Sequence, residues 1–165
     1  MYQETLVILK PDALERNLTG ALIDRFERAG LKVLDVRYYA KVDEALLRKH
    51  YPDAMAESLG RKAQQATTGI VDPVAHGMKV LERLRRYFTW SPVIAIKFGG
   101  EDAIQVVRRV TGYTDPATAE KGTIRSDYGV DSIARSTAEG RALENLIHAS
   151  GNPEEAKAEL ALWFP

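Results

Sequence analysis

Short apolar runs alternate with longer amphipathic stretches along this chain. Residues 5–9 (Thr-Leu-Val-Ile-Leu) are almost continuously apolar, and a run of this length is typical of a buried central strand. Residues 31–39 and 93–98 are rich in β-branched and aromatic side chains and are bounded by glycine or proline, which predicts two further strands. A fourth, shorter strand is expected around His148.

Amphipathic patterns between these segments predict helices. Residues 19–29 and 101–111 each place apolar side chains on one face and are followed by a glycine, which commonly ends a helix. Residues 42–51 precede a proline, and proline disfavours helical geometry at the residue before it. Helical composition resumes at residues 138–144.

The last helix has the clearest start in the sequence. Asn152 is a suitable N-cap, Pro153 fits the first helical position, and Glu154 and Glu155 follow in the first turn. Amide N–H groups at a helix start are unpaired and carry partial positive charge, so acceptor and acidic side chains stabilise that end. We therefore expect a helix from Pro153 toward the end of the chain.

Residues 54–78 are polar and mixed, with a turn signal at Gly69. We interpret this region as a helical excursion inserted on the surface after Tyr51. Residues 74–88 then carry apolar side chains at helical spacing, which predicts a helix up to the next strand.

The order of the predicted elements favours one α+β domain over residues 1–165. Strand, helix, strand, then strand, helix and a short strand suggest a ferredoxin-like antiparallel sheet with helices packed on one face. A doubly wound α/β sheet is the alternative architecture.

Composition narrows the range of functions. Of the 165 residues, 45% are hydrophobic, and 23 Lys and Arg balance 23 Asp and Glu. The chain can therefore bury a core, but it has no net charge to attract nucleic acid or an anionic membrane. No cysteine is present, which removes disulfides and thiol chemistry. We expect a cytoplasmic protein that binds neither nucleic acid nor membrane.

Two segments are candidates for chemistry. Residues 113–124 show no apolar period, and a long loop in a compact domain is more often functional than decorative. In residues 145–150 (Asn-Leu-Ile-His-Ala-Ser), His148 follows two apolar residues and precedes a turn. An imidazole in such a place can act as a base, a metal ligand or a nucleophile, or it can be a hydrogen-bonded structural group.

Known phosphate-binding loops are absent. The chain has no Gly-x4-Gly-Lys-Ser/Thr loop, no Gly-x-Gly-x-x-Gly after a strand and no histidines paired at metal spacing. Any phosphate would have to be held by side chains such as Lys10, Arg109 and Arg125.

Four motifs and the C-terminal segment resemble nucleoside diphosphate kinases in content and order. They are Lys10-Pro11-Asp12, residues 112–117 (Gly-Tyr-Thr-Asp-Pro-Ala), residues 122–127 (Gly-Thr-Ile-Arg-Ser-Asp), residues 145–150, and residues 159–164 (Glu-Leu-Ala-Leu-Trp-Phe).

This resemblance implies a phosphotransferase. It implies a ferredoxin-like core and ping-pong transfer of the γ-phosphoryl group from a nucleoside triphosphate such as ATP to a nucleoside diphosphate such as GDP, through phosphorylated His148. It also implies a homo-oligomer and Mg²⁺ held through the nucleotide phosphates, with no metal ligand from the protein.

The resemblance also implies roles for individual residues. Lys10, Ser150 and Glu159 join His148 as catalytic residues, with Ser150 and Glu159 orienting the ring from its second nitrogen. The expected nucleotide-binding residues are Lys10, Tyr51, Arg109, Thr114, Arg125 and Asn145.

The chain departs from the family pattern at a few positions. Gly151 stands where an acid is common, so we expect a more flexible turn and a lost charge contact. Asn17 stands where glycine is common, and asparagine tolerates a left-handed backbone. No base-stacking residue is assigned, and the region after Tyr51 fits either a lid over the nucleotide or an outer decoration.

Two other functions compete with the kinase. A nucleotide-binding regulator on the same scaffold would not need the complete catalytic set. A ferredoxin-like RNA-binding or small-ligand module would display aromatic side chains on its strands and usually a basic face, whereas these strands are aliphatic and the net charge is zero.

Overall fold

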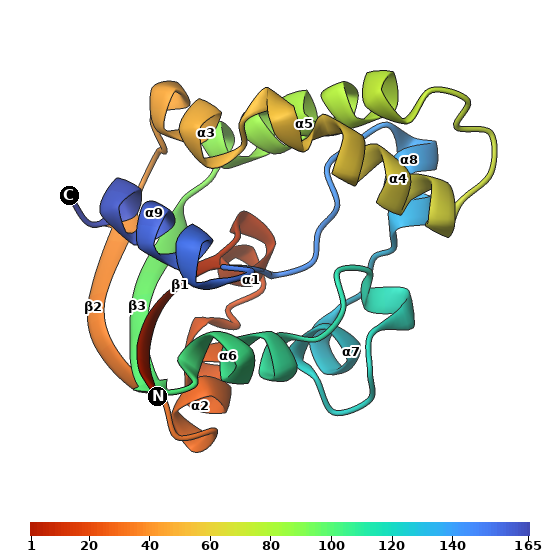
Figure 1. Ribbon diagram of the computed structural model, residues 1–165. Helices are drawn as coiled ribbons and strands as arrows, with labels where there is room; N and C mark the ends of the chain where they lie inside the picture. Colours follow the sequence, from red (N-terminus) through yellow and green to blue (C-terminus); the bar gives the residue numbers. More distant parts are fainter.

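A computed structural model describes all residues from Met1 to Pro165. Its centre is a four-stranded antiparallel sheet in the order β2-β3-β1-β4 (Figure 1). The strands are β1 (Tyr2–Leu9), β2 (Lys32–Tyr39), β3 (Val93–Glu101) and β4 (Ile147–Ala149). The α+β, ferredoxin-like prediction is confirmed.

Nine α-helices and two short 3₁₀ helices connect and cover the strands. They are α1 (Pro11–Glu15), α2 (Thr19–Arg28), α3 (Glu44–His50), η1 (Asp53–Met55), α4 (Ala56–Ala66), α5 (Pro73–Trp90), α6 (Ala103–Thr111), η2 (Pro116–Thr118), α7 (Ile124–Tyr128), α8 (Ile133–Glu139) and α9 (Pro153–Trp163). None of these helices is both long and apolar enough to cross a bilayer.

Helices cover both faces of the sheet, so the expectation of one covered face is wrong. Val7 and Leu9 of β1 pack with side chains of α2 and α6, whereas Leu6 and Ile8 pack with side chains of α3, α5 and α9. The physical reason is that successive residues of a strand point to opposite faces, and these four apolar residues are all fully buried.

The region after Tyr51 is a tightly packed helical hairpin of α4 and α5. Gly60 lies against the Pro73 carbonyl group and Gly77 lies against the Ala56 carbonyl group, and a Cβ atom at either glycine would be 1.7 Å from the oxygen. The helical insertion is confirmed, but it does not sit loosely on the surface. Its inner face is part of the hydrophobic core. The backbones of α4 and α5 approach closely because a glycine lies at each contact.

The helix predicted at residues 138–144 is wrong in position, because α8 spans Ile133–Glu139. Ser132 starts the helix by accepting a hydrogen bond from the backbone N–H of Arg135, and Gly140 ends it with φ 67°. The loop predicted at residues 113–124 contains η2, and α7 begins at its last residue.

Candidate functional site

A strained turn lies immediately before His148. Leu146 is fully buried and has φ 71°, and the N–H of Ile147 donates to the Asn145 carbonyl oxygen at 2.8 Å. A positive φ at a branched residue costs energy and persists only when surrounding contacts hold it. Here the Lys10 N–H donates to the Leu146 carbonyl oxygen at 2.9 Å, and Asp12 accepts from the Leu146 N–H at 3.0 Å.

Arg125 holds the same turn from its other side. This buried guanidinium donates to the carbonyl oxygens of Asn145 at 3.1 Å, Gly112 at 3.0 Å and Ile147. Burial, followed by the charge of Arg108, lowers the pKa of Arg125 to about 10. Three of its five donors are therefore used by the backbone, and two remain for another acceptor.

His148 is oriented by a carboxylate. Its Nε2 lies 2.9 Å from Oε1 of Glu159, and the Ser150 hydroxyl donates to Oε2 of the same carboxylate at 2.5 Å. An ionised carboxylate only accepts hydrogen bonds, so this contact places the ring proton on Nε2. The other nitrogen, Nδ1, bonds to no protein group and keeps a free electron pair.

A second buried imidazole, that of His50, lies beside the His148–Glu159 pair. The His50 ring lies 4.3 Å from the His148 ring, centroid to centroid, and Nδ1 of His50 accepts from the Trp163 indole at 3.2 Å. Burial lowers the pKa of His50 to about 3, so the ring is neutral. Burial raises the pKa of Glu159, but contacts with His148, His50 and Ser150 more than offset this and leave it at about 2.

These side chains are also the ligand types of a metal site. Ligand atoms of His50, His148 and Glu159 lie within 4.8 Å of one another. However, Nδ1 of His50 already accepts from Trp163, and Nε2 of His148 is bonded to Glu159. The arrangement therefore serves to orient the imidazole of His148.

Lys10 brings a buried ammonium group to the same region. It donates to the Asn145 side-chain oxygen at 2.8 Å and to the Leu143 carbonyl oxygen at 3.0 Å. Burial lowers the pKa of Lys10 to about 8, although Asp12 acts in the opposite direction. The Asn145 amide in turn donates to the carbonyl oxygen of Thr114 at 2.9 Å.

Tyr51 lies on the side of the site formed by α3. Its ring is buried and meets the His148 ring edge to face at 6.2 Å between centroids. Burial raises the pKa of its hydroxyl, so this group stays protonated near neutral pH. Its carbonyl oxygen accepts from Arg85, which also pairs with Asp53 at 2.7 Å.

The structure brings most of the predicted site residues together around one strained turn. They are Lys10, Tyr51, Thr114, Arg125, Asn145, His148, Ser150 and Glu159.

Arg109 lies apart from these residues, and its neighbour Arg108 lies closer to them. The buried side of α6 is formed by Ile104, Val107 and Thr111. At 100° per residue, Arg108 borders this side, whereas Arg109 points almost directly away from it. The charge of Arg108 also acts on Arg125.

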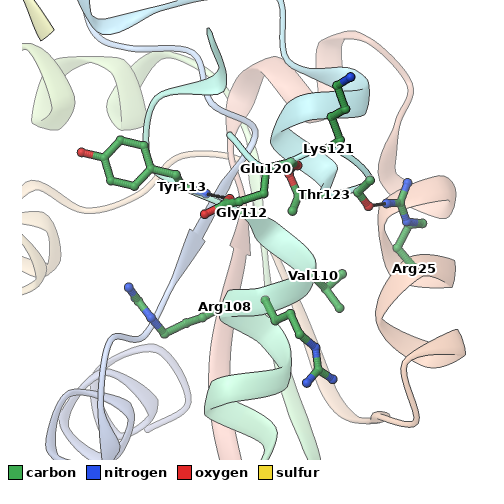
Figure 2. A pocket seen from close by; sticks show the side chains of 10 residues that line it. Arg25, Arg108, Val110, Gly112, Tyr113, Glu120, Lys121 and Thr123 are labelled. Atoms are coloured by element: carbon green, nitrogen blue, oxygen red, sulfur yellow. Dashed lines mark hydrogen bonds between the residues drawn. The ribbon is translucent and has the colours of Figure 1, made fainter. Parts of the chain in front are cut away.

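A cavity of about 600 Å³ lies beside this site, at the C-terminal end of α6. It is lined by Arg25, Arg108, Arg109, Val110, Gly112, Tyr113, Glu120, Lys121, Gly122 and Thr123. Figure 2 shows Arg108 on the Tyr113 side of this cavity, away from Arg25. The helical spacing of the apolar residues in α6 is a sequence signal that could have distinguished Arg108 from Arg109.

The chemistry of this site suits transfer of an anionic group. A free imidazole nitrogen is a nucleophile, and the surrounding ammonium and guanidinium groups can neutralise negative charge that develops during transfer. The carboxylate on the opposite ring nitrogen stabilises the imidazole as it becomes positive.

Comparisons with known proteins agree over almost the whole chain. The family model for nucleoside diphosphate kinase matches residues 3–165. The nucleoside diphosphate kinase of Pyrobaculum aerophilum is 37% identical over 98% of this chain and 94% of the relative. That of Thermococcus kodakarensis is 39% identical over 98% of this chain and 76% of the relative.

Two solved structures are similar throughout. An NDP kinase from Pyrobaculum aerophilum superposes with a TM-score of 0.90 at 34% identity, covering 100% of this chain and 97% of the other. A nucleoside-diphosphate kinase from Borrelia burgdorferi, solved as a transition state mimic with bound vanadate and ADP, gives a TM-score of 0.84 at 35% identity. That match covers 99% of this chain and 88% of the other.

Proposed function

Because this chain belongs to the nucleoside diphosphate kinase family and is a nucleoside-diphosphate kinase, we propose that Nδ1 of His148 carries the phosphoryl group between the two nucleotides. The observation that supports this most directly is the ring orientation: Nε2 is bonded to Glu159, which leaves Nδ1 free. Membership in this family disfavours the two competing functions, which were a nucleotide-binding regulator without turnover and an RNA-binding module.

The reaction has two matching halves. The electron pair of Nδ1 attacks the γ-phosphorus of a nucleoside triphosphate, the bond to the bridging oxygen breaks, and the nucleoside diphosphate leaves. No proton has to leave Nδ1, because the ring proton is on Nε2. A terminal phosphate oxygen of the second diphosphate then attacks the phosphorus, and the bond to Nδ1 breaks.

Glu159 stabilises the ring in both halves. The imidazole becomes positively charged as the nitrogen–phosphorus bond forms, and an anionic acceptor on Nε2–H lowers the energy of that state. Ser150 holds the second oxygen of this carboxylate, so the carboxylate cannot rotate away from the ring.

The nucleotide is held by side chains. Lys10, Arg108 and Arg125 would bind the phosphates, with Arg108 in the role expected of Arg109. Thr114 would add a hydroxyl to the distal phosphate, and Asn145 would bind the sugar hydroxyl. Tyr51 would support Lys10 from the side of α3. Guanidinium groups suit bidentate contacts to phosphate, whereas an ammonium acts as a point charge.

We propose that Mg²⁺ is held through the nucleotide phosphates. Oδ2 of Asp12 and both oxygens of Glu159 accept hydrogen bonds from the chain, and the charged groups assigned to the phosphates are cationic. When bound to the phosphates, Mg²⁺ neutralises part of their charge.

Assembly into a homo-oligomer is also proposed. The edge strand β2 exposes Leu34, Val36 and Tyr38, and exposed apolar residues on an edge strand favour association. Light scattering of the purified protein would give the number of subunits. The cytoplasmic location stays a prediction from the sequence.

The proposed mechanism is tested by separating its two halves. The protein is incubated with γ-labelled ATP and Mg²⁺ without an acceptor, and we expect acid-labile, alkali-stable label on the protein. Addition of GDP should then transfer the label to GTP. An unlabelled protein that still makes GTP when both nucleotides are present would rule out the phosphohistidine intermediate.

Lys10 gives a prediction about pH. Because burial lowers its pKa to about 8, the ammonium is charged below that pH and neutral above it. We expect kcat/KM for the triphosphate to fall as the pH rises through about 8, with a weaker effect on kcat, because bound phosphate stabilises the ammonium. The Lys10→Arg variant should move the fall to higher pH. A fall of kcat/KM at the same pH in Lys10→Arg would contradict the assignment of this pH dependence to Lys10.

A further inference from the structure

The helix α4 has three distinct sides. Ala56, Gly60 and Ala63 are buried against α5. Leu59 and Lys62 are half-buried on the adjoining side. Since residues three and four apart share a side of a helix, this half-buried stripe is a second inward-facing surface, distinct from the contact with α5.

Lys62 has no partner on this inward-facing side. It forms no hydrogen bond and no ion pair, whereas its neighbour Arg61 is exposed and pairs with Glu57 one turn earlier at 2.6 Å. Lysine is one of the side chains least often buried without a partner. A half-buried, unpaired ammonium therefore indicates a place for an anion that the free protein lacks.

The groups that face Lys62 come from three other elements. Burial, then Arg108 of α6, then Arg125 of α7 lower the pKa of Lys62, and Glu155 of α9 acts in the opposite direction. Arg125 is in turn affected by Arg108, and Lys10 by Arg125. Lys10, Lys62 and Arg108 thus each lie within electrostatic reach of Arg125.

The backbone of α4 is held firmly in this position. The contacts of Gly60 with Pro73 and of Gly77 with Ala56 leave no room for a Cβ atom, and on α4 both lie within the two turns that precede Lys62. Figure 1 shows α4 in the upper part of the view and α6 and α7 in the lower part. From this rigid helix, Lys62 lies within electrostatic reach of Arg108 of α6 and Arg125 of α7.

We propose that Lys62 is a nucleotide-binding residue whose ammonium contacts the phosphates of the bound nucleotide from the side of α4, opposite Arg108 and Arg125. This inference rests on the proposed function of the site. It makes α4 one wall of the nucleotide site, rather than a decoration on the outside of the enzyme.

The test compares the binding of ADP with Mg²⁺ by calorimetry in Lys62→Gln, Lys62→Arg and Arg61→Gln. Lys62→Gln should raise the Kd about tenfold to hundredfold, the effect of losing one charge-assisted hydrogen bond. Lys62→Arg keeps the charge and should stay within about threefold of wild type. Arg61→Gln, a neighbour on the exposed side, should have no effect.

Two further measurements separate phosphate binding from other roles. Binding of adenosine, which has no phosphate, should be equal in wild type and Lys62→Gln. Phosphorylation of His148 by phosphoramidate, whose phosphorus–nitrogen bond breaks as ammonia leaves, should also be equal, because no nucleotide takes part.

The proposal has clear contrary results. Three results would each overturn it. They are an unchanged Kd for ADP in Lys62→Gln, a loss of adenosine binding equal to the loss of ADP binding, and a loss of unfolding free energy in the nucleotide-free variant as large as its loss of ADP-binding free energy. In all three cases wild type would still form phosphohistidine and transfer it to GDP. Failure of the proposed function would instead appear as an unlabelled wild-type protein.

Discussion

Replacement of His148 by alanine is expected to lower kcat by at least about 10⁴-fold, the usual scale for loss of a nucleophile. No other side chain can substitute for it. The His50 ring is only 4.3 Å away, but it is buried and its Nδ1 accepts from Trp163. Steady-state transfer from ATP to GDP gives kcat, and calorimetry should give an ADP affinity close to that of wild type.

The third histidine provides the matched control. His76 lies in the first turn of α5 and bonds to no group of the site. His76→Ala should therefore keep nearly full turnover. Substantial turnover in His148→Ala, or equal losses in both variants, would contradict the role of His148.

Arg125→Ala should reduce stability as well as activity. The substitution leaves the carbonyl oxygens of Gly112, Asn145 and Ile147 without this donor, and each unsatisfied buried polar group costs about 1 to 3 kcal/mol. We expect the free energy of unfolding to fall by about 3 kcal/mol. Turnover should fall too, because the turn before His148 loses its support. Urea denaturation and steady-state kinetics measure the two effects.

An exposed arginine is the control for this effect. Arg135 pairs with Glu139 one turn away on the surface of α8, and such exposed pairs contribute little to stability. Arg125→Lys should stay well below wild-type stability, since an ammonium does not reproduce the geometry of three guanidinium contacts. If Arg125→Ala were as stable as Arg135→Ala, Arg125 would not be the group that holds the turn.

Local backbone chemistry was the part of the fold that the sequence predicted best. Asn152 accepts from the Glu155 N–H at 2.8 Å and Pro153 begins α9, as expected. Asn17 has φ 55°, which confirms the left-handed backbone inferred at that position. Such features depend on neighbouring residues alone, so they can be read from a short stretch of sequence.

The contacts of Gly151 could not be predicted from its neighbouring residues alone. Its N–H donates to Oε2 of Glu155 at 2.8 Å, and a Cβ atom here would lie 2.6 Å from that oxygen. Glu155 also accepts from the Asn152 side chain at 2.9 Å. The expected loss of an acidic contact at this turn is therefore wrong, because Glu155 supplies a carboxylate from the first turn of α9.

The identity of the site residues came from ordered motifs, but their geometry did not. Which nitrogen of His148 stays free depends on how α9 crosses β1 and brings Glu159 back to the ring. The choice between Arg108 and Arg109 depends on the rotation of α6 against the sheet. The inward side of α4 likewise depends on its glycine contacts with α5. These are tertiary facts with no counterpart in a short sequence motif.

The position of the phosphoryl group on the ring tests the account most directly. Wild-type protein labelled with γ-labelled ATP is hydrolysed in alkali, and the two phosphohistidine isomers are separated by chromatography. Because Glu159 is bonded to Nε2, the label should be on the isomer phosphorylated at Nδ1. A label mainly on the Nε2 isomer would contradict the assigned orientation of His148 and the role of Glu159.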